Sequence, residues 1–134
     1  MAKKLPETNH QYYNFDPVLF TLFDKSDAPC LRYDYYVNGA IRQDFALEKL
    51  ELSGFDDALQ NLDSRQFPIR LCLKVGVRSL HFTLKRIDRH GYVKGDFVVK
   101  VFGWLPVSWI RVNIRHVSLR RFVDDLVERI EQAV

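Results

Sequence analysis

The sequence predicts an α+β protein in which a C-terminal amphipathic helix covers one face of an antiparallel sheet. Short alternations of apolar and polar side chains recur along the chain, as in half-buried strands. An Asn-Gly pair separates two of them, which is typical of a tight hairpin. Residues 117–134 instead place their apolar side chains at helical spacing. We expect a single-layer sheet of about six to seven strands, built from a hairpin, a short helix and a four-strand meander.

Length and composition fit one folded domain. A chain of 134 residues can form a core without a metal or a disulfide, and its 47% hydrophobic and 28% charged content is ordinary for a globular protein. We expect a loose N-terminal arm over residues 1–14 and a single α+β domain over residues 15–134. The two cysteines, Cys30 and Cys72, lie in strand-like runs, which favours buried thiols of a reduced compartment over a disulfide.

The first half of the chain predicts three strands. Residues 18–23 form an apolar run that ends at a polar cluster. Residues 31–37 alternate strictly, and the pair at residues 38–39 tolerates the positive φ of a type I′ turn. Residues 41–47 then return as the second strand of a hairpin.

Two helices are expected, one in the middle of the chain and one at its end. Apolar side chains in residues 55–62 recur at helical spacing, and Ser53 is placed to cap this helix. Ser118 is placed to cap the final helix, whose apolar stripe runs along residues 119–133. A stripe of this kind could dock a partner, but a sheet also needs a cover for its apolar face.

Four further strands make up the meander and carry most of the positive charge. Residues 67–116 have a net charge of +8, whereas residues 1–66 have −4 and residues 117–134 have −1. The two acids of the meander, Asp88 and Asp96, are expected at turns. Side chains that alternate away from the core share one face of an antiparallel sheet. That face should present Arg70, Lys74, His81, Thr83, Lys85, Arg111, Asn113 and Arg115, with Lys100 if its strand has the matching register.

The strand connection at residues 103–109 carries two tryptophans around a proline. Large apolar side chains in a turn act as binding anchors when they are exposed, because Trp and Arg dominate interface energetics. They can equally fold back over the edge of the core. The sequence leaves both readings open for Trp104 and Trp109.

No motif indicates catalysis, a cofactor or a metal. The chain lacks a phosphate-binding glycine loop, cysteines at zinc spacing and a nucleophile elbow. His81 and His116 both lie in or beside the predicted basic sheet, but an acid–base pair would also need a carboxylate to orient one ring. We therefore expect a protein that is not an enzyme and binds no cofactor.

The sequence also predicts a cytoplasmic protein. Its N-terminus is basic but is followed by polar residues, unlike a secretory signal. No run approaches the roughly 18–20 apolar residues that span a bilayer.

The order of the predicted elements resembles that of small immunity proteins of bacterial polymorphic and contact-dependent toxin systems, in particular the WapI-type immunity family. The residues that carry the resemblance are residues 35–37, Phe45 and Leu47 leading into residues 55–62, the strand pair around Gly76, and residues 117–126. The likeness covers roughly residues 30–134. It implies a protein without a catalytic site that binds a toxin domain and blocks it.

The leading hypothesis is a non-enzymatic protein that neutralises a cognate toxin domain by direct contact. Immunity proteins against nucleases tend to present acids, so a basic sheet implies either a toxin with an acidic surface or contact through the acidic flanks. The expected contact residues are Arg70, Lys74, Lys85, Lys100, Arg111, Arg115, Trp104 and Trp109.

Two other hypotheses stay open. The same basic face of residues 67–116 could bind nucleic acid, although it offers few aromatic side chains for stacking. A small enzyme around His81 and His116 would need both rings in one pocket with an acid. The sequence also leaves open a homodimer.

Overall fold

The computed structural model describes residues 6–36 and 39–133, so Asn38 of the expected hairpin turn lies outside the described residues. The described residues form nine strands, two α-helices and one 3-10 turn. In chain order these are β1 (Glu7–Phe15), β2 (Val18–Lys25), β3 (Ala28–Tyr36), β4 (Ala40–Ala46), η1 (Leu47–Lys49), β5 (Glu51–Ser53), α1 (Phe55–Ser64), β6 (Ile69–Val75), β7 (Arg78–Ile87), β8 (Tyr92–Val101), β9 (Leu105–Arg115) and α2 (His116–Ala133).

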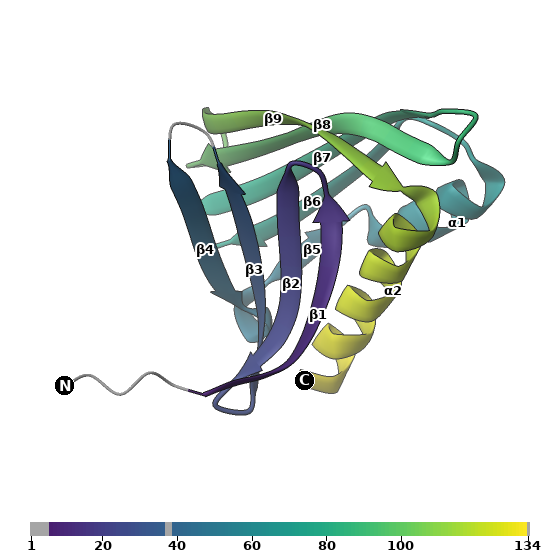
Figure 1. The fold of residues 1–134 in the computed structure, drawn as a ribbon. Helices are drawn as coiled ribbons and strands as arrows, with labels where there is room; N and C mark the ends of the chain where they lie inside the picture. Colours follow the sequence, from purple (N-terminus) through teal and green to yellow (C-terminus); the bar gives the residue numbers. More distant parts are fainter. Residues whose placement is uncertain (1–5, 37–38, 134) are drawn as a thin grey trace.

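The strands form two antiparallel sheets rather than one. The N-terminal sheet has the order β1-β2-β3-β4, and the C-terminal sheet has the order β5-β6-β7-β8-β9. Figure 1 shows the two sheets facing each other, with α2 running along the side where β1 and β9 approach. The α+β class and the C-terminal helix are confirmed, but the prediction of a single layer is wrong. Each sheet has one apolar face, and these two faces pack against each other over much of their area.

Aromatic side chains fill the space between the sheets. The ring of Phe20, on β2, lies 5.5 Å from that of Phe82 on β7 and 5.6 Å from that of Phe97 on β8. The ring of Phe122, on α2, lies 5.4 Å from the same Phe20 ring. All four side chains are fully buried, so one core joins both sheets to the helix.

Helix α2 buries the stripe that its sequence predicts. Leu119, Phe122, Val123 and Leu126 are all completely buried. The helix begins at His116, directly after β9, and not behind a Ser118 cap. A ring nitrogen of His116 lies 2.7 Å from the carbonyl oxygen of Leu62, which ties the start of α2 to α1.

The expected N-terminal arm is largely a strand. Residues 7–14 belong to β1, which pairs with β2 at the edge of the N-terminal sheet. Within β1 only Tyr13 and Phe15 are buried, and a bulge after Thr8 interrupts the pairing register. The sequence therefore lacks a clear alternation here. The strand is also tied to α2, because the Tyr13 hydroxyl donates a 2.5 Å hydrogen bond to Asp125.

Helix α1 is confirmed, but its cap differs from the expectation. Ser53 belongs to β5 and pairs with Cys72, so Gly54 precedes the helix instead. Gly54 has a φ of +83°, and a Cβ at this position would lie 2.4 Å from the carbonyl oxygen of Arg70. Only glycine combines this backbone conformation with so close an approach.

Candidate functional site

The outer face of the C-terminal sheet is open and basic. Its cross-strand register aligns Arg70, Thr83, Asp96 and Arg111 in one row over four strands. Below, the basic face means this surface with its six predicted cations: Arg70, Lys74, Lys85, Lys100, Arg111 and Arg115. Five of the six are exposed and Lys100 is half-buried.

The register of Lys100 confirms that it belongs to the basic face. Lys100 pairs with Ser79, and its charge is close enough to act on two other groups of the same face. Burial, and then the positive charge of Lys100, lower the pKa of His81 below its ordinary value. Burial raises the pKa of the Cys72 thiol, while Lys74 and Lys100 oppose that shift.

Asp96 lies in the middle of the basic face, not at a turn. Strand β8 begins at Tyr92, earlier than the sequence suggests, so Asp96 falls inside it. The carboxylate is only 8% exposed, and Lys85 Nζ lies 2.7 Å from its Oδ2 atom. The pKa of Asp96 is held below its ordinary value by the hydrogen bond from Lys85, and further by the Trp109 indole N–H and the charge of Arg111. Asp96 thus holds Lys85, one of the predicted contact residues, in an ion pair.

A pocket of about 430 Å³ opens on the basic face beside Asp96. We call it the cationic pocket, and it is lined by Lys85, Arg86, Lys94, Gly95, Asp96, Arg111, Val112 and Asn113. Arg86 and Lys94 are not among the contact residues predicted from the sequence. The register shifts between Leu84 and Arg86, and this bulge lets consecutive residues, Lys85 and Arg86, line the same pocket.

Gly95 allows the two strands beneath the cationic pocket to approach closely. A Cβ at this position would lie 2.2 Å from the carbonyl oxygen of Thr83 and 2.8 Å from the Cα atom of Leu84. Any other side chain would push β7 and β8 apart. A lone glycine within a strand pattern is the sequence signal that could have located this feature.

The connection expected at residues 103–109 is shorter than predicted, because β9 already begins at Leu105 and includes Trp109. Trp104 and Trp109 are both exposed, which answers the question left open by the sequence. Trp104 is 71% exposed and Trp109 is 72% exposed. They belong to what we call the apolar end, a group of exposed side chains on the β6–β7 and β8–β9 connections and the start of β9. Its members are Val77, Phe102, Trp104, Leu105, Val107 and Trp109. The Phe102 N–H donates a 2.7 Å hydrogen bond to the Val77 carbonyl oxygen, which joins the two connections.

Arg115 lies away from the other predicted contact residues. It pairs with Tyr92 at the opposite end of β9 from the apolar end. Its Nε atom donates a 3.3 Å hydrogen bond to the Tyr92 hydroxyl, and its guanidinium lies 5.6 Å from the centre of the Tyr92 ring. The structure therefore brings Lys85 and Arg111 together but leaves Arg115 at the margin.

The two histidines considered for acid–base chemistry are not brought together. His81 stands in the same cross-strand row as Trp109, and Arg115, next to His116, lies six residues further along β9. Six residues correspond to roughly 20 Å along a strand. A ring nitrogen of His81 contacts the Ser79 hydroxyl at 2.8 Å, whereas that of His116 contacts a backbone carbonyl.

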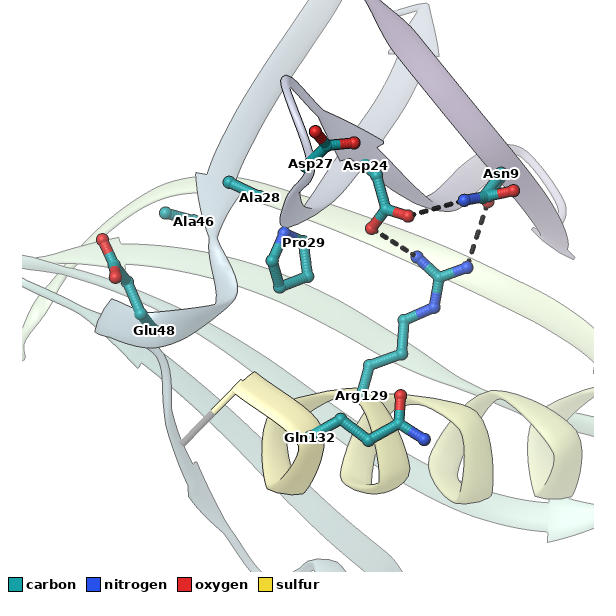
Figure 2. Close-up of a pocket in the computed structure, with 9 residues that line it drawn as sticks. All are labelled: Asn9, Asp24, Asp27, Ala28, Pro29, Ala46, Glu48, Arg129 and Gln132. Atoms are coloured by element: carbon teal, nitrogen blue, oxygen red, sulfur yellow. Dashed lines mark hydrogen bonds and ion pairs between the residues drawn. The ribbon is translucent and has the colours of Figure 1, made fainter.

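A second cavity, of about 510 Å³, lies between the β2–β3 hairpin and the end of α2. Figure 2 shows its lining residues, in which Arg129 points from the helix toward Asp24 and Asn9. Arg129 Nη1 lies 3.6 Å from Asp24 Oδ1, and Nη2 donates a 3.0 Å hydrogen bond to the Asn9 carbonyl oxygen. These contacts hold α2 against the N-terminal sheet.

Within the described part of the chain, no three His, Cys, Asp or Glu side chains gather in a way that could hold a metal ion. The helices over the same residues are too short or too polar to cross a bilayer.

No protein-family model matches the chain, and no curated protein matches it in sequence. The resemblance to immunity proteins therefore depends on the element order and on the residues named for it.

Proposed function

We propose that this chain is a non-enzymatic binding protein that neutralises a cognate toxin domain by direct contact. The observation that carries the proposal is the exposure of Trp104 and Trp109 beside the basic face. Trp and Arg are the side chains that most often dominate protein–protein binding energy. A toxin that acts inside the cell would place the protein in the cytoplasm.

The apolar end favours a protein as the partner. Besides its aromatic members it exposes Val77, Leu105 and Val107, which are aliphatic. Aliphatic side chains gain free energy when another apolar surface covers them, at about 25 cal/mol per Å² buried. They offer no stacking surface to a base. A cluster of this kind next to charged residues matches the apolar core and polar rim of protein interfaces.

The charges favour contact through the basic face rather than through the acidic flanks. On the N-terminal sheet the acids are held by cations of the same protein. Glu7 and Asp44 both bind Arg32, and Asp34 binds Arg42 at 2.6 Å. On the basic face Arg70 and Arg111 form no ion pair with any residue that the structure describes. A partner with an acidic surface would be steered toward this side of the molecule.

The proposal predicts a toxin domain encoded beside this gene, and that domain provides the direct test. Co-expression with this protein should restore growth, and the two proteins should form a complex when purified. The double variant Trp104→Ala/Trp109→Ala should bind at least about tenfold more weakly, because hot-spot tryptophans contribute 2 kcal/mol or more. The control is Tyr12→Ala, an exposed aromatic residue on β1. Unchanged binding by the double variant would refute contact through the tryptophans.

Nucleic acid is the second candidate partner, because Trp109 presents an exposed ring on the basic face itself. Single-stranded nucleic acids bind grooves in which basic side chains follow the backbone and aromatic rings stack on the bases. Binding to such a strand must weaken linearly with salt on logarithmic axes. An oligonucleotide titration at low salt that shows no binding would remove this candidate.

A further inference from the structure

We propose that the cationic pocket is a binding site for a phosphoryl group. This proposal goes beyond the protein contact proposed above and does not depend on it. The ligand would be free phosphate or the phosphate of a nucleotide, two sources that share the same chemistry. The charge of the pocket, its shape and the polar group in its wall all favour such a ligand.

The pocket has more positive charge than its own acids neutralise. Four cations line it, and Asp96 is the one acid among its lining residues. Lys85 is matched by Asp96 at 2.7 Å, and Lys94 Nζ lies 3.9 Å from Asp88 outside the pocket. Arg86 and Arg111 have no ion-pair partner within residues 6–36 and 39–133. Two guanidinium groups are therefore available to an anion.

The backbone brings these cations together from three strands. The bulge on β7 presents Lys85 and Arg86, β8 presents Lys94, and β9 presents Arg111. At Gly95 the backbones of β7 and β8 approach closely, and no side chain from this position fills the pocket. The arrangement is thus set by the sheet and not by flexible loops, which favours a defined site over a diffuse field.

The directions of the cations favour a phosphoryl group over a carboxylate. A carboxylate is planar, and a single guanidinium fork can bind both of its oxygens. A phosphoryl group carries up to two negative charges and spreads three oxygens around a tetrahedral centre. The two available guanidinium groups, Arg86 on β7 and Arg111 on β9, reach the pocket from different strands, which suits the second geometry better than the first.

The pocket wall also contains an amide that lacks a partner. The Oδ1 atom of Asn113 is buried and has no hydrogen-bond partner among the described residues. An amide can accept a hydrogen bond from a ligand hydroxyl through its oxygen or donate one to a phosphate oxygen through its nitrogen. The isolated atom is an acceptor, so a ligand hydroxyl, such as a ribose hydroxyl of a nucleotide, could satisfy it, whereas an ionised phosphate oxygen could not.

The Trp109 ring can distinguish a nucleotide from free phosphate. It lies two residues before Arg111 on the same face of β9, which is about 7 Å along the strand. The Trp109 indole is close enough to Asp96, which lines the pocket, to help lower the pKa of that carboxyl. A nucleotide could therefore place its phosphate in the pocket and stack its base on the exposed Trp109 ring. Free phosphate would leave that ring unchanged.

The test uses the full chain and titrates it with inorganic phosphate and, separately, with AMP, while NMR follows the Gly95 amide and the Asn113 side chain. The pocket variant is Arg86→Gln/Arg111→Gln. The control variant Arg70→Gln/Lys74→Gln removes the same charge from the same sheet outside the pocket. We expect saturable shifts at Gly95 and Asn113, with affinity about tenfold or more weaker in the pocket variant and nearly unchanged in the control.

Three outcomes have defined meanings. Tighter binding of AMP than of inorganic phosphate, with a change in Trp109 fluorescence, supports the site and identifies a nucleotide as its source. Equal affinities without a fluorescence change support the site and identify free phosphate. The absence of saturable shifts, or equal weakening in both variants, overturns the proposal, because the charge would then act only as a diffuse field.

Discussion

Lys85 and Asp96 form a 2.7 Å ion pair in the middle of an otherwise cationic surface. The lysine is exposed, whereas the carboxylate is almost completely buried. Asp96 is therefore a fixed negative charge paired with Lys85, and the nearby Trp109 indole and Arg111 charge also help to keep its pKa below the ordinary value. The exposed lysine can regain water when the pair breaks, but the carboxylate cannot.

Removing Lys85 should raise the pKa of Asp96. The folded-state pKa of this carboxyl lies below its unfolded value, first because of Lys85. Asp96 therefore stabilises the fold above its unfolded pKa of about 3.9 and loses that effect as the pH falls through its folded pKa. In Lys85→Ala the loss should begin at a higher pH. NMR titration of the Asp96 carboxyl carbon measures the shift, and an unchanged pKa would contradict this account.

Arg32 should contribute far more stability than Arg42. Arg32 is nearly buried over the Phe23 ring and binds both Glu7 and Asp44. Its replacement by Ala removes the main cation of both carboxylates and leaves only His10 near Glu7 and Lys25 near Asp44, so we expect a loss of about 2–3 kcal/mol in the free energy of unfolding. Arg42 forms one exposed pair, and Arg42→Ala should cost less than about 1 kcal/mol. Urea denaturation compares the two, and equal losses would contradict the prediction.

The pairing of β1 should weaken in acid. Hydrogen bonds from Arg32 and then His10 lower the pKa of Glu7 to about 2, from an ordinary value of 4.5. The stabilising effect of Glu7 is therefore fully present above pH 4.5 and is lost as the pH falls toward 2. Amide hydrogen exchange in β1, corrected for intrinsic rates, should show protection that falls over this range. Glu7→Gln should remove that dependence, and a pH-independent wild type would refute it.

Replacement by alanine should destabilise the protein strongly at Phe20 and very little at Phe102. Phe20 packs against rings from both sheets and from α2, so Phe20→Ala should cost about 3–5 kcal/mol in the free energy of unfolding. Phe102 is exposed at the apolar end, and Phe102→Ala should change stability by no more than about 0.5 kcal/mol. Chemical denaturation measures both. A large loss in Phe102→Ala would mean that the apolar end belongs to the core.

Local patterns predicted most of the elements correctly. The alternation of residues 69–75 and 79–85 placed the basic side chains on the outer face, and the stripe of α2 is buried as its spacing indicates. These predictions succeed because burial on one face imposes a period of two on a strand and of 3.6 on a helix. Neither period says which surface covers a given face, so the second sheet could not be predicted.

The parts of the site that escaped prediction depend on irregular backbone. The bulge before Arg86 breaks the alternation, and so Arg86 does not stand out as a residue of the basic face. Asp96 follows Gly95, and a glycine at this place in the sequence favours a turn. In the structure Gly95 instead lies inside β8, where it allows close packing against β7. β1 was not predicted because only Tyr13 and Phe15 of this strand are buried and another bulge shifts its register. Tertiary contacts decide each of these cases.

The central claim is that the basic face and its tryptophans bind a protein partner. Calorimetric titration of the neighbouring toxin domain with the charge-reversal variant Arg111→Glu/Arg115→Glu tests it most directly. The control Arg42→Glu/Arg65→Glu makes the same charge change at exposed positions outside the basic face. The account predicts at least about tenfold weaker binding for the first variant and little change for the control. Equal affinity of wild type and Arg111→Glu/Arg115→Glu would contradict it.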